Sequence, residues 1–248
     1  MKITAFNASM RGEKSITTIM LREFLRGAKE AGAVTEHVIL KKMKINRCLG
    51  CLNCWIKTPG ACVQKDDHPG LLEKYMASDV VVFASPVYVE NVTGLMKDFI
   101  DRLIPITDPH FMVGDHGETK HFKRYDKYPG IVAMSNSGFV EQTAFDVLRL
   151  MFRRVAKSMS AELIGEIYRG GGGLLGLDQP ALSPLVDEYK ALLRKCGAEI
   201  VQRRVLSDET ALQLEKQIVP TEIYNMQVNA WWDTLIAKAK EKQSKKEV

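Results

Sequence analysis

Short apolar runs alternate with stretches of helical period along residues 1–205. Each run is rich in β-branched residues and is bounded by small or polar ones, which is typical of a buried strand. Between the runs, apolar residues recur at helical spacing, as Ile16, Met20 and Phe24 do. The pattern predicts strands at residues 2–9, 34–40, 79–88, 130–138 and 161–168.

This alternation predicts an α/β fold. Helices that connect parallel strands cover both faces of the sheet, so we expect a flavodoxin-like, doubly wound parallel sheet of five strands in the order 2-1-3-4-5. Residues 106–129 show neither period and predict an irregular insertion. Residues 206–248 have a helical pattern broken at Pro220 and predict a C-terminal helical extension beyond a domain of residues 1–205.

The length and net charge of the chain limit the classes of protein to which it can belong. The chain has 248 residues and a formal net charge of +5, with much of the excess in a Lys-rich tail. We therefore expect one large domain, with neither nucleic-acid nor membrane partners. The first residues read as a strand, without the apolar core of a signal peptide, and no apolar run is long enough to span a membrane. We expect a cytoplasmic protein, and a reducing compartment disfavours disulfides.

The loop after the first strand, residues 7–18, has the chemistry of a phosphate site. It places hydroxyls and Arg11 at the start of a helix, where backbone N–H groups and the helix dipole favour an anion. It matches neither the Walker pattern nor GxGxxG. Ser15 or Thr17 could instead simply cap the helix, and the residues alone favour neither interpretation.

Two further strand ends carry small polar residues. Residues 85–94, "SPVYVENVTG", could wrap a flat ring with backbone amides, with Tyr88 beside it. In the alternative, Tyr88 belongs to the core and Asn91 caps a helix. Residues 135–142, "SNSGFVEQ", could approach the edge of a ring or form a plain glycine turn.

Together, these three loops resemble those of the NAD(P)H-dependent FMN reductase family, over roughly residues 1–205. The resemblance implies an FMN-binding domain, NAD(P)H as co-substrate and oxidoreductase activity, with chemistry that the flavin supplies and no catalytic side chain. For the FMN phosphate it implies Ser9, Arg11, Ser15, Thr17 and the Ile16 amide. For the flavin ring it implies Ser85, Pro86, Val87, Tyr88 and Asn91, with Ser135, Asn136 and Gly138 in the third loop.

Four of the five cysteines lie close together in the sequence. Cys48, Cys51 and Cys54 have two-residue gaps, and Cys62 follows after a Pro-Gly turn. Such spacing lets thiolates converge on an iron–sulfur cluster, whereas structural zinc sites more often use two separated pairs. Four reduced cysteines without metal remain the main alternative, and a disulfide is the weakest.

The cysteine run also resembles the compact motif of iron–sulfur flavoproteins, which implies a [4Fe–4S] cluster on all four thiols. A similar pattern, with Trp55 and two aspartates after the last cysteine, occurs in flavin reductases without a known cluster, so both interpretations stay open. Because the run follows the second strand, we expect it at the same edge of the sheet as the flavin loops.

The sequence therefore predicts an FMN-dependent oxidoreductase that passes electrons from NAD(P)H through FMN to an acceptor, with or without a [4Fe–4S] cluster. The alternatives are a non-enzymatic electron carrier that exchanges electrons with ferredoxin-like partners, and a regulatory or scaffold protein that keeps FMN as a structural ligand. Apolar and aromatic residues in the insertion and the C-terminal extension predict a homodimer or homotetramer that covers the flavin.

Overall fold

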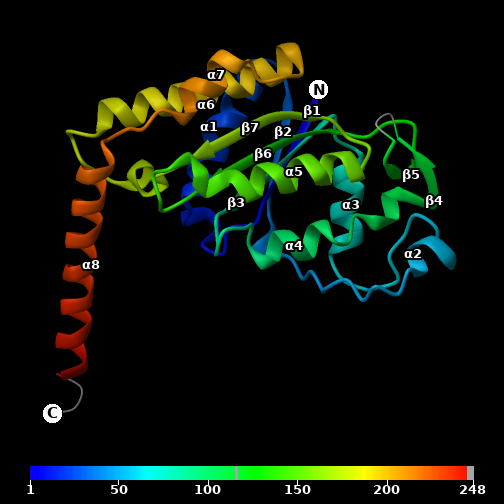
Figure 1. Ribbon diagram of the computed structural model, residues 1–248, viewed down its shortest axis with the longest axis horizontal. Coiled ribbons are helices and arrows are strands. Elements are labelled where there is room, and N and C mark those ends of the chain that lie inside the picture. The colour runs from blue at the N-terminus through cyan, green and yellow to red at the C-terminus, as the bar shows by residue number, and fades with distance from the viewer. Residues whose placement is uncertain (115–116, 245–248) are drawn as a thin grey trace. The chain divides into compact units, whose positions relative to one another are not determined.

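Five parallel strands form one sheet in the computed structural model, which describes residues 1–114 and 117–244 (Figure 1). The strand order is β2-β1-β3-β6-β7, and every neighbouring pair is parallel. The predicted order 2-1-3-4-5 is confirmed, with β6 and β7 as the fourth and fifth strands of the sheet. The bounds are β1 Lys2–Asn7, β2 Val34–Ile39, β3 Val80–Pro86, β6 Gly130–Asn136 and β7 Leu163–Arg169.

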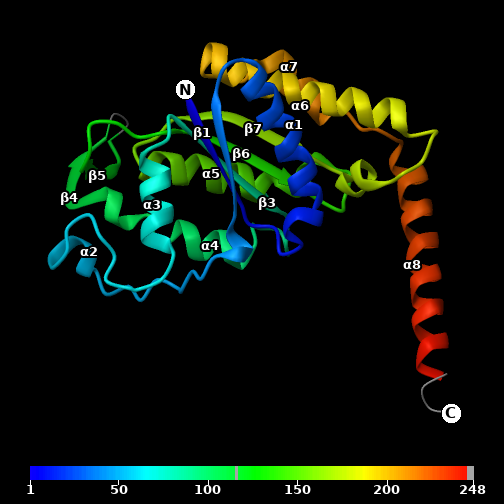
Figure 2. The same ribbon diagram turned by 180° about the vertical axis from the view of Figure 1, so that it is seen from behind.

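Helices cover both faces of this sheet (Figures 1 and 2). One face carries α1 (Ile16–Glu30) and α6 (Ser183–Arg203), and the other carries α3 (His68–Met76), α4 (Gly94–Ile100) and α5 (Asp146–Ser158). Glycines let α1 and α6 pack closely: a Cβ at Gly197 would lie 2.0 Å from the carbonyl oxygen of Phe24. A Cβ at Gly27 would lie 1.9 Å from the carbonyl oxygen of Arg194.

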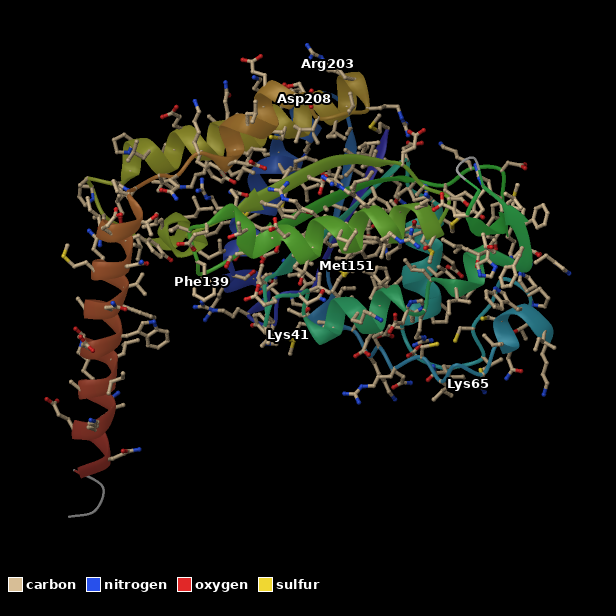
Figure 3. All side chains as sticks on the ribbon, viewed as in Figure 1. Lys41, Lys65, Phe139, Met151, Arg203 and Asp208 are labelled. Carbon is tan, nitrogen blue, oxygen red and sulfur yellow. The ribbon has the colours of Figure 1, made fainter. Side chains whose placement is uncertain are left out.

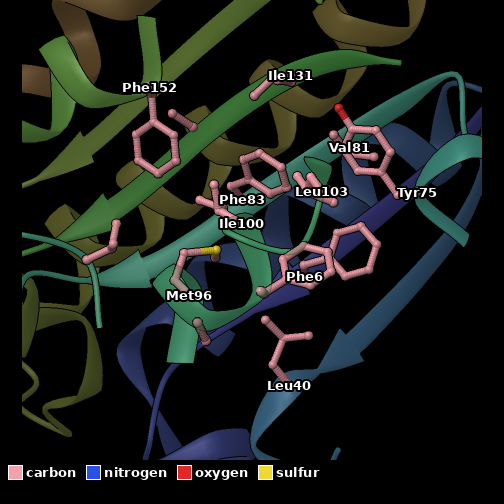
Figure 4. Packing of buried hydrophobic residues seen from close by; sticks show 14 of the residues in the cluster. Phe6, Leu40, Tyr75, Val81, Phe83, Met96, Ile100, Leu103, Ile131 and Phe152 are labelled. Atoms are coloured by element: carbon pink, nitrogen blue, oxygen red, sulfur yellow. The ribbon is translucent and has the colours of Figure 1, made fainter. Parts of the chain in front are cut away.

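The main core lies between the sheet and the α3–α4–α5 layer (Figure 4). Successive side chains of a strand point to opposite faces, so Phe6 and Phe83 enter this core from β1 and β3. Phe6 packs on Phe99 of α4, with ring centroids 4.7 Å apart, and Phe83 stacks on Phe152 of α5 at 6.2 Å. These contacts hold α4 and α5 against the strands.

The insertion is not irregular, contrary to the prediction. Residues Thr107–Val113 (β4) and Thr119–Lys123 (β5) pair as an antiparallel hairpin with a register shift between Thr107 and Phe111. Most side chains of the two strands are exposed or half-buried, so no alternation of apolar and polar residues marks them in the sequence.

The chain divides into two compact units, Met1–Lys216 and Gln217–Val248. Helix α7 (Asp208–Glu215) belongs to the first unit, because Glu199 of α6 accepts hydrogen bonds from Ser207 and Thr210 at its start. The second unit contains α8 (Thr221–Ser244). The first compact unit thus ends at Lys216, beyond the expected domain limit at residue 205. None of the helices in the described ranges has the length and apolar character needed to span a membrane.

Candidate flavin site and cysteine loop

The three polar loops predicted from the sequence meet at the carboxyl edge of the sheet, where the parallel strands end. Ser135 Oγ donates to the Ser85 carbonyl oxygen at 2.6 Å, which ties the end of β6 to the end of β3. Thr93 Oγ1 donates to the Ala8 carbonyl oxygen at 3.0 Å, which ties the second loop to the first. These hydrogen bonds hold the loops around the switch in strand order, where open α/β sheets bind ligands.

In the first loop, Ser15 is the N-cap of α1. Its Oγ accepts from the Thr18 amide at 3.1 Å and donates to the Gly12 carbonyl oxygen at 2.7 Å. Thr17 Oγ1 accepts from Asn136 Nδ2 at 2.8 Å, and Ser9 Oγ accepts from the Arg11 amide at 3.3 Å. The hydroxyls of this loop therefore shape the backbone.

Free donors remain at the same helix end. Amides in the first turn of α1, such as that of Ile16, have no acceptor within the helix. Arg11 is exposed, and its guanidinium has no ion pair within the described ranges 1–114 and 117–244. No acidic residue lies in the first turn of α1. The loop thus offers a helix N-terminus and the cation of Arg11, a combination that suits a phosphate.

The second loop ends in a tight turn at Tyr88–Asn91. The amide of Tyr88 donates to the Asn91 carbonyl oxygen at 2.7 Å, and both central residues, Val89 and Glu90, have positive φ. Tyr88 is 45% exposed and does not belong to the core. The N-cap of α4 is Thr93, whose Oγ1 accepts from the Met96 amide, so the alternative role of Asn91 as this cap is wrong.

The third loop leaves its edge open to solvent. Ser135 is fully buried, whereas Gly138 is exposed and the ring of Phe139 is 64% exposed. The Asn136 carbonyl oxygen accepts from the Val87 amide at 2.8 Å and so joins this loop to the second. Exposed Tyr88 and Phe139 therefore belong to loops that are hydrogen-bonded to each other at one edge of the sheet.

The cysteine loop lies at the opposite, amino edge of the sheet, which corrects the expected placement. The chain leaves β2 at the carboxyl edge, where Ile39 pairs with Asn7, and then runs beneath α4 to α2 (Asn53–Ile56) at the far end (Figures 1 and 2). Figure 3 shows Phe139 and Lys65 at opposite ends of the first unit. The seven residues of α4 alone span about 10 Å, so the thiols and the flavin loops are well separated within one chain.

Hydrogen bonds close the base of the cysteine loop. The Lys44 amide donates to Asp67 Oδ2 at 2.7 Å, and the Asn46 amide donates to Asp66 Oδ2 at 2.8 Å. Gln64 Nε2 donates to the Arg47 carbonyl oxygen at 2.9 Å. The two ends of the loop are therefore held side by side before and after the cysteines.

Arg102, just after α4, reaches into this base. It forms a buried ion pair with Asp66, and its Nη2 also donates to Cys62 Sγ at 3.3 Å. Burial would raise the pKa of Asp66, but hydrogen bonds from Arg102 and from the amides of Asn46 and His68 outweigh it and hold this pKa below its ordinary value. Asp66 is therefore a carboxylate at neutral pH.

The hairpin β4–β5 packs on the cysteine loop. Trp55 Nε1 donates to the carbonyl oxygens of Ile104 and Thr107 at 3.2 and 3.0 Å, and its ring lies 5.0 Å from the ring of His121. A Cβ at Gly60 would lie 3.0 Å from the hydroxyl of Tyr125. The insertion thus supports the cysteines, and within one chain it does not cover the flavin loops.

A groove of about 500 Å³ opens beside Cys48 at the same edge. Apolar and charged residues line this groove. It lies between the C-terminal ends of α4 and α5, and its lining includes no residue of the flavin loops. Its lining from those helices includes Lys97, Ile100, Asp101, Met151, Arg154 and Val155.

A family model of NADPH-dependent FMN reductases matches residues 1–161, which is more than half of the chain. This chain belongs to the NADPH-dependent FMN reductase family. The flavin loops at residues 7–18, 85–94 and 135–142 all fall within the matched range, so the predicted family is confirmed.

Curated relatives of this family member include iron–sulfur flavoproteins. One from Archaeoglobus fulgidus is 42% identical over 98 residues, a match that covers 40% of this chain and 44% of that protein. One from Methanocaldococcus jannaschii is 35% identical over 106 residues, covering 43% of this chain and 53% of that protein. The chain thus spans about half the length of the curated relatives it matches.

Solved structures show the same fold. An FMN-dependent NADH-azoreductase from Bacillus anthracis, in complex with FMN, superposes with a TM-score of 0.59 at 14% identity, over 81% of this chain and 99% of that one. An NAD(P)H:quinone oxidoreductase from Methanothermobacter marburgensis gives a TM-score of 0.54 at 15% identity, over 81% of this chain and 96% of that one.

The carboxyl edge of this FMN reductase family member fits FMN by its donors. Arg11 and the first-turn amides of α1 suit the phosphate, and at the same edge Pro86 and Val87 are half-buried while Tyr88 and Gly138 are exposed, which leaves surface for a ring. Gly172 packs closely on the first and third loops, because a Cβ there would lie 3.0 Å from Cβ of Asn136 and 3.3 Å from Cγ2 of Ile16.

The cysteine loop fits a cluster by its donor set. Cys48 and Cys51 are exposed and Cys54 and Cys62 are half-buried, all as free thiols. Burial raises the pKa of Cys54, and nearby Cys62, Cys48 and Cys51 add to this shift. They are not gathered into a ligand set, since no group of three or more His, Cys, Asp or Glu in the described part of the chain is placed to hold a metal.

Two residues of these sites were missed from the sequence. Thr93 joins the flavin loops and caps α4, and a Thr at a helix start is a recognisable cap signal that Asn91 obscured. Arg102 follows α4 in "DFIDRLIP", and nothing in its surroundings in the sequence points to Asp66 or Cys62. Its role emerges only when the loop folds back along α4.

Proposed function

We propose that this chain is an FMN-dependent oxidoreductase that passes electrons from NAD(P)H through FMN to an acceptor, with a [4Fe–4S] cluster on its cysteine loop. The observation that carries the proposal is the joining of three polar loops at the carboxyl edge, beside a helix N-terminus with the cation of Arg11. FMN, when bound, supplies the exchange of electron pairs and single electrons, and the protein supplies binding and orientation.

In this proposal, the first loop holds the FMN phosphate through Arg11 and the amides of Ile16 and Thr17. Ser9 and Ser15 act indirectly, because their hydroxyls shape the backbone that presents those amides. The loop from Ser85 to Asn91 would hold the flavin ring together with Ser135, Asn136 and Gly138 of the third loop. Tyr88 and Phe139 are exposed in these two loops and would be available to contact a nicotinamide.

Replacing Arg11 with alanine is expected to weaken FMN binding by about tenfold to a hundredfold. A charge-assisted hydrogen bond to phosphate contributes on the order of 1.5–3 kcal/mol, and each 1.4 kcal/mol is about a factor of ten in affinity. Fluorescence titration of FMN into the flavin-free protein measures the effect. Arg26→Ala is the matched control, because Arg26 lies in α1 but pairs with Glu30 on its exposed face. Equal affinities for the two variants would remove Arg11 from the site.

The supporting evidence for the cluster is the donor set of Cys48, Cys51, Cys54 and Cys62 together with the names of the curated relatives. Holding a cluster requires that the loop close around it. The exposed stretch from Cys48 to Cys51 can move without disturbing the core, whereas Cys62 is already anchored by Arg102. A cluster here would be a one-electron carrier at the surface of the protein.

An electron carrier without a substrate of its own is the second candidate. It is favoured by the exposure of Cys48 and Cys51, because an exposed cluster edge suits a ferredoxin-like partner. Anaerobic stopped-flow mixing with NADH or NADPH separates the two functions. Bleaching of the flavin absorption within seconds supports the oxidoreductase, and no bleaching by either nucleotide over hours, with FMN bound, supports the carrier.

We expect a homodimer or homotetramer in solution. The flavin loops and the cysteine loop lie at opposite edges of one chain, so we expect electrons to pass between the two groups of different copies. The hairpin presents exposed Phe111, Val113 and Phe122, which suit a partner surface. Light scattering of the FMN-loaded protein at micromolar concentration should give at least twice the mass of one chain. A monomer with FMN fully bound would contradict this assembly.

A further inference from the structure

A single arginine connects the cysteine loop to the protein core. The side chain of Arg102 is 1% exposed, and the side chain of its partner Asp66 is fully buried. Its Nη1 donates to Asp66 and to the Asn46 carbonyl oxygen, while Nη2 donates to Asp66 Oδ1 at 3.0 Å and to Cys62 Sγ at 3.3 Å. One guanidinium therefore bonds the start of the loop, its end and its last cysteine.

The charges around this contact are balanced without Cys62. Asp66 accepts two hydrogen bonds from Arg102 and one each from the amides of Asn46 and His68, so both of its carboxylate oxygens are hydrogen-bonded. Burial lowers the pKa of His68 to about 4, so that side chain is neutral at pH 7. The ion pair is complete without Cys62, so the hydrogen bond to its sulfur is an additional contact of the same guanidinium.

We propose that Arg102 is a positioning residue of the cysteine site, which fixes Cys62 Sγ and, by donating to it, raises the reduction potential of the cluster held there. This inference rests on the proposed cluster function. Hydrogen bonds to ligand sulfurs and nearby positive charge stabilise the reduced, more negative state of a cluster, and burial strengthens both effects. The other cysteines have no comparable partner, because no guanidinium or ammonium contact to Cys48, Cys51 or Cys54 occurs in the described part of the chain.

The test is a redox titration of anaerobically purified protein, followed by paramagnetic resonance, on three forms: the parent, Arg102→Lys, and the double variant Arg102→Gln with Asp66→Asn. Lysine keeps the charge that Asp66 needs but lacks the planar fork that reaches both Asp66 and Cys62. The double variant removes both buried charges together, so that no unpaired ion destabilises the loop. Iron and FMN contents are measured on the same samples.

We expect both variants to keep their iron and to show a lower midpoint potential for the cluster, because both lose the guanidinium fork that donates to Cys62 Sγ. The FMN potential should stay unchanged in all three, because the flavin loops lie at the opposite edge of the sheet. Lys97→Gln is the matched control: Lys97 lines the groove beside Cys48 but pairs with Asp101 at the surface, so it should leave both potentials unchanged.

Each outcome decides a different point. Iron retained with an unchanged cluster potential in both variants would overturn the role of Arg102 and leave the proposed cluster intact. An equal fall in potential in Lys97→Gln would also overturn it, because general surface charge would then be the cause. Parent protein without iron would refute the cluster function, and this inference with it.

Discussion

Replacing Cys51 with alanine is expected to abolish iron binding while leaving FMN bound. A [4Fe–4S] cluster needs all four thiolates, and the chain offers no fifth thiol nearby, since Cys196 is buried in α6. Cys51 is exposed, so its loss costs little packing. The flavin loops lie at the opposite edge of the sheet and share no residue with the cysteine loop. Iron should therefore fall from about four per chain to near zero, at constant FMN, in protein purified anaerobically with iron supplied.

Cys196→Ala provides the matched control for this prediction. It removes one sulfur from the same chain, but its burial raises the pKa of that thiol to about 12, and no thiolate is available there for a metal. Its iron content should equal that of the parent. Equal iron in Cys51→Ala and Cys196→Ala would show that Cys51 is not a ligand, and loss of FMN from Cys51→Ala would show that the two sites are not independent.

Replacing Arg102 alone with glutamine is expected to destabilise the protein by about 3–5 kcal/mol, because it leaves the Asp66 carboxylate buried without a counter-ion. The free energy of unfolding of the metal-free protein in urea, at equal FMN concentration, measures the change. The double variant that adds Asp66→Asn should be much closer to the parent, because removing both partners of a buried pair leaves no uncompensated charge.

The loss of stability in Arg102→Gln should also depend on pH. In the parent, the pKa of Asp66 is depressed, so the carboxylate contributes stability above its unfolded value and loses it as pH falls through the folded value. Without Arg102, burial raises the pKa of Asp66. The difference in the free energy of unfolding between parent and variant should therefore shrink as pH falls toward about 4. A single variant as stable as the double one at pH 7 would mean that Asp66 is not held as a buried anion.

The sheet was predictable because its signals are local. Runs such as residues 80–84 and 130–134 are apolar throughout, as central strands buried on both faces must be, and polar residues follow them in the sequence. The hairpin β4–β5 gave no such signal. Its strands bury few side chains, and their pairing is supported by Trp55, which lies far away in the sequence.

Of the two sites, the meeting of the flavin loops could be predicted from the sequence, and the position of the cysteine loop could not. That the flavin loops would meet follows from parallel strands, whose carboxyl ends share one edge. The position of the cysteine loop does not follow from its place after β2, because contacts with Arg102 and with the end of α4 decide to which edge a long loop returns. Whether Asn91 or Thr93 caps the helix depends on the turn before it, in which two residues have positive φ. The sequence "YVEN" does not indicate such a turn.

The central claim is that this FMN reductase family member carries both a flavin and a cluster on one chain. The most direct test is a visible absorption spectrum of anaerobically purified protein, calibrated by its iron and acid-labile sulfide content. The account predicts flavin bands for one FMN above a broad absorption, with about four irons and four sulfides per chain. A purely yellow spectrum without iron, from cells supplied with iron, would contradict it and make the four cysteines a metal-free loop of a plain flavin reductase.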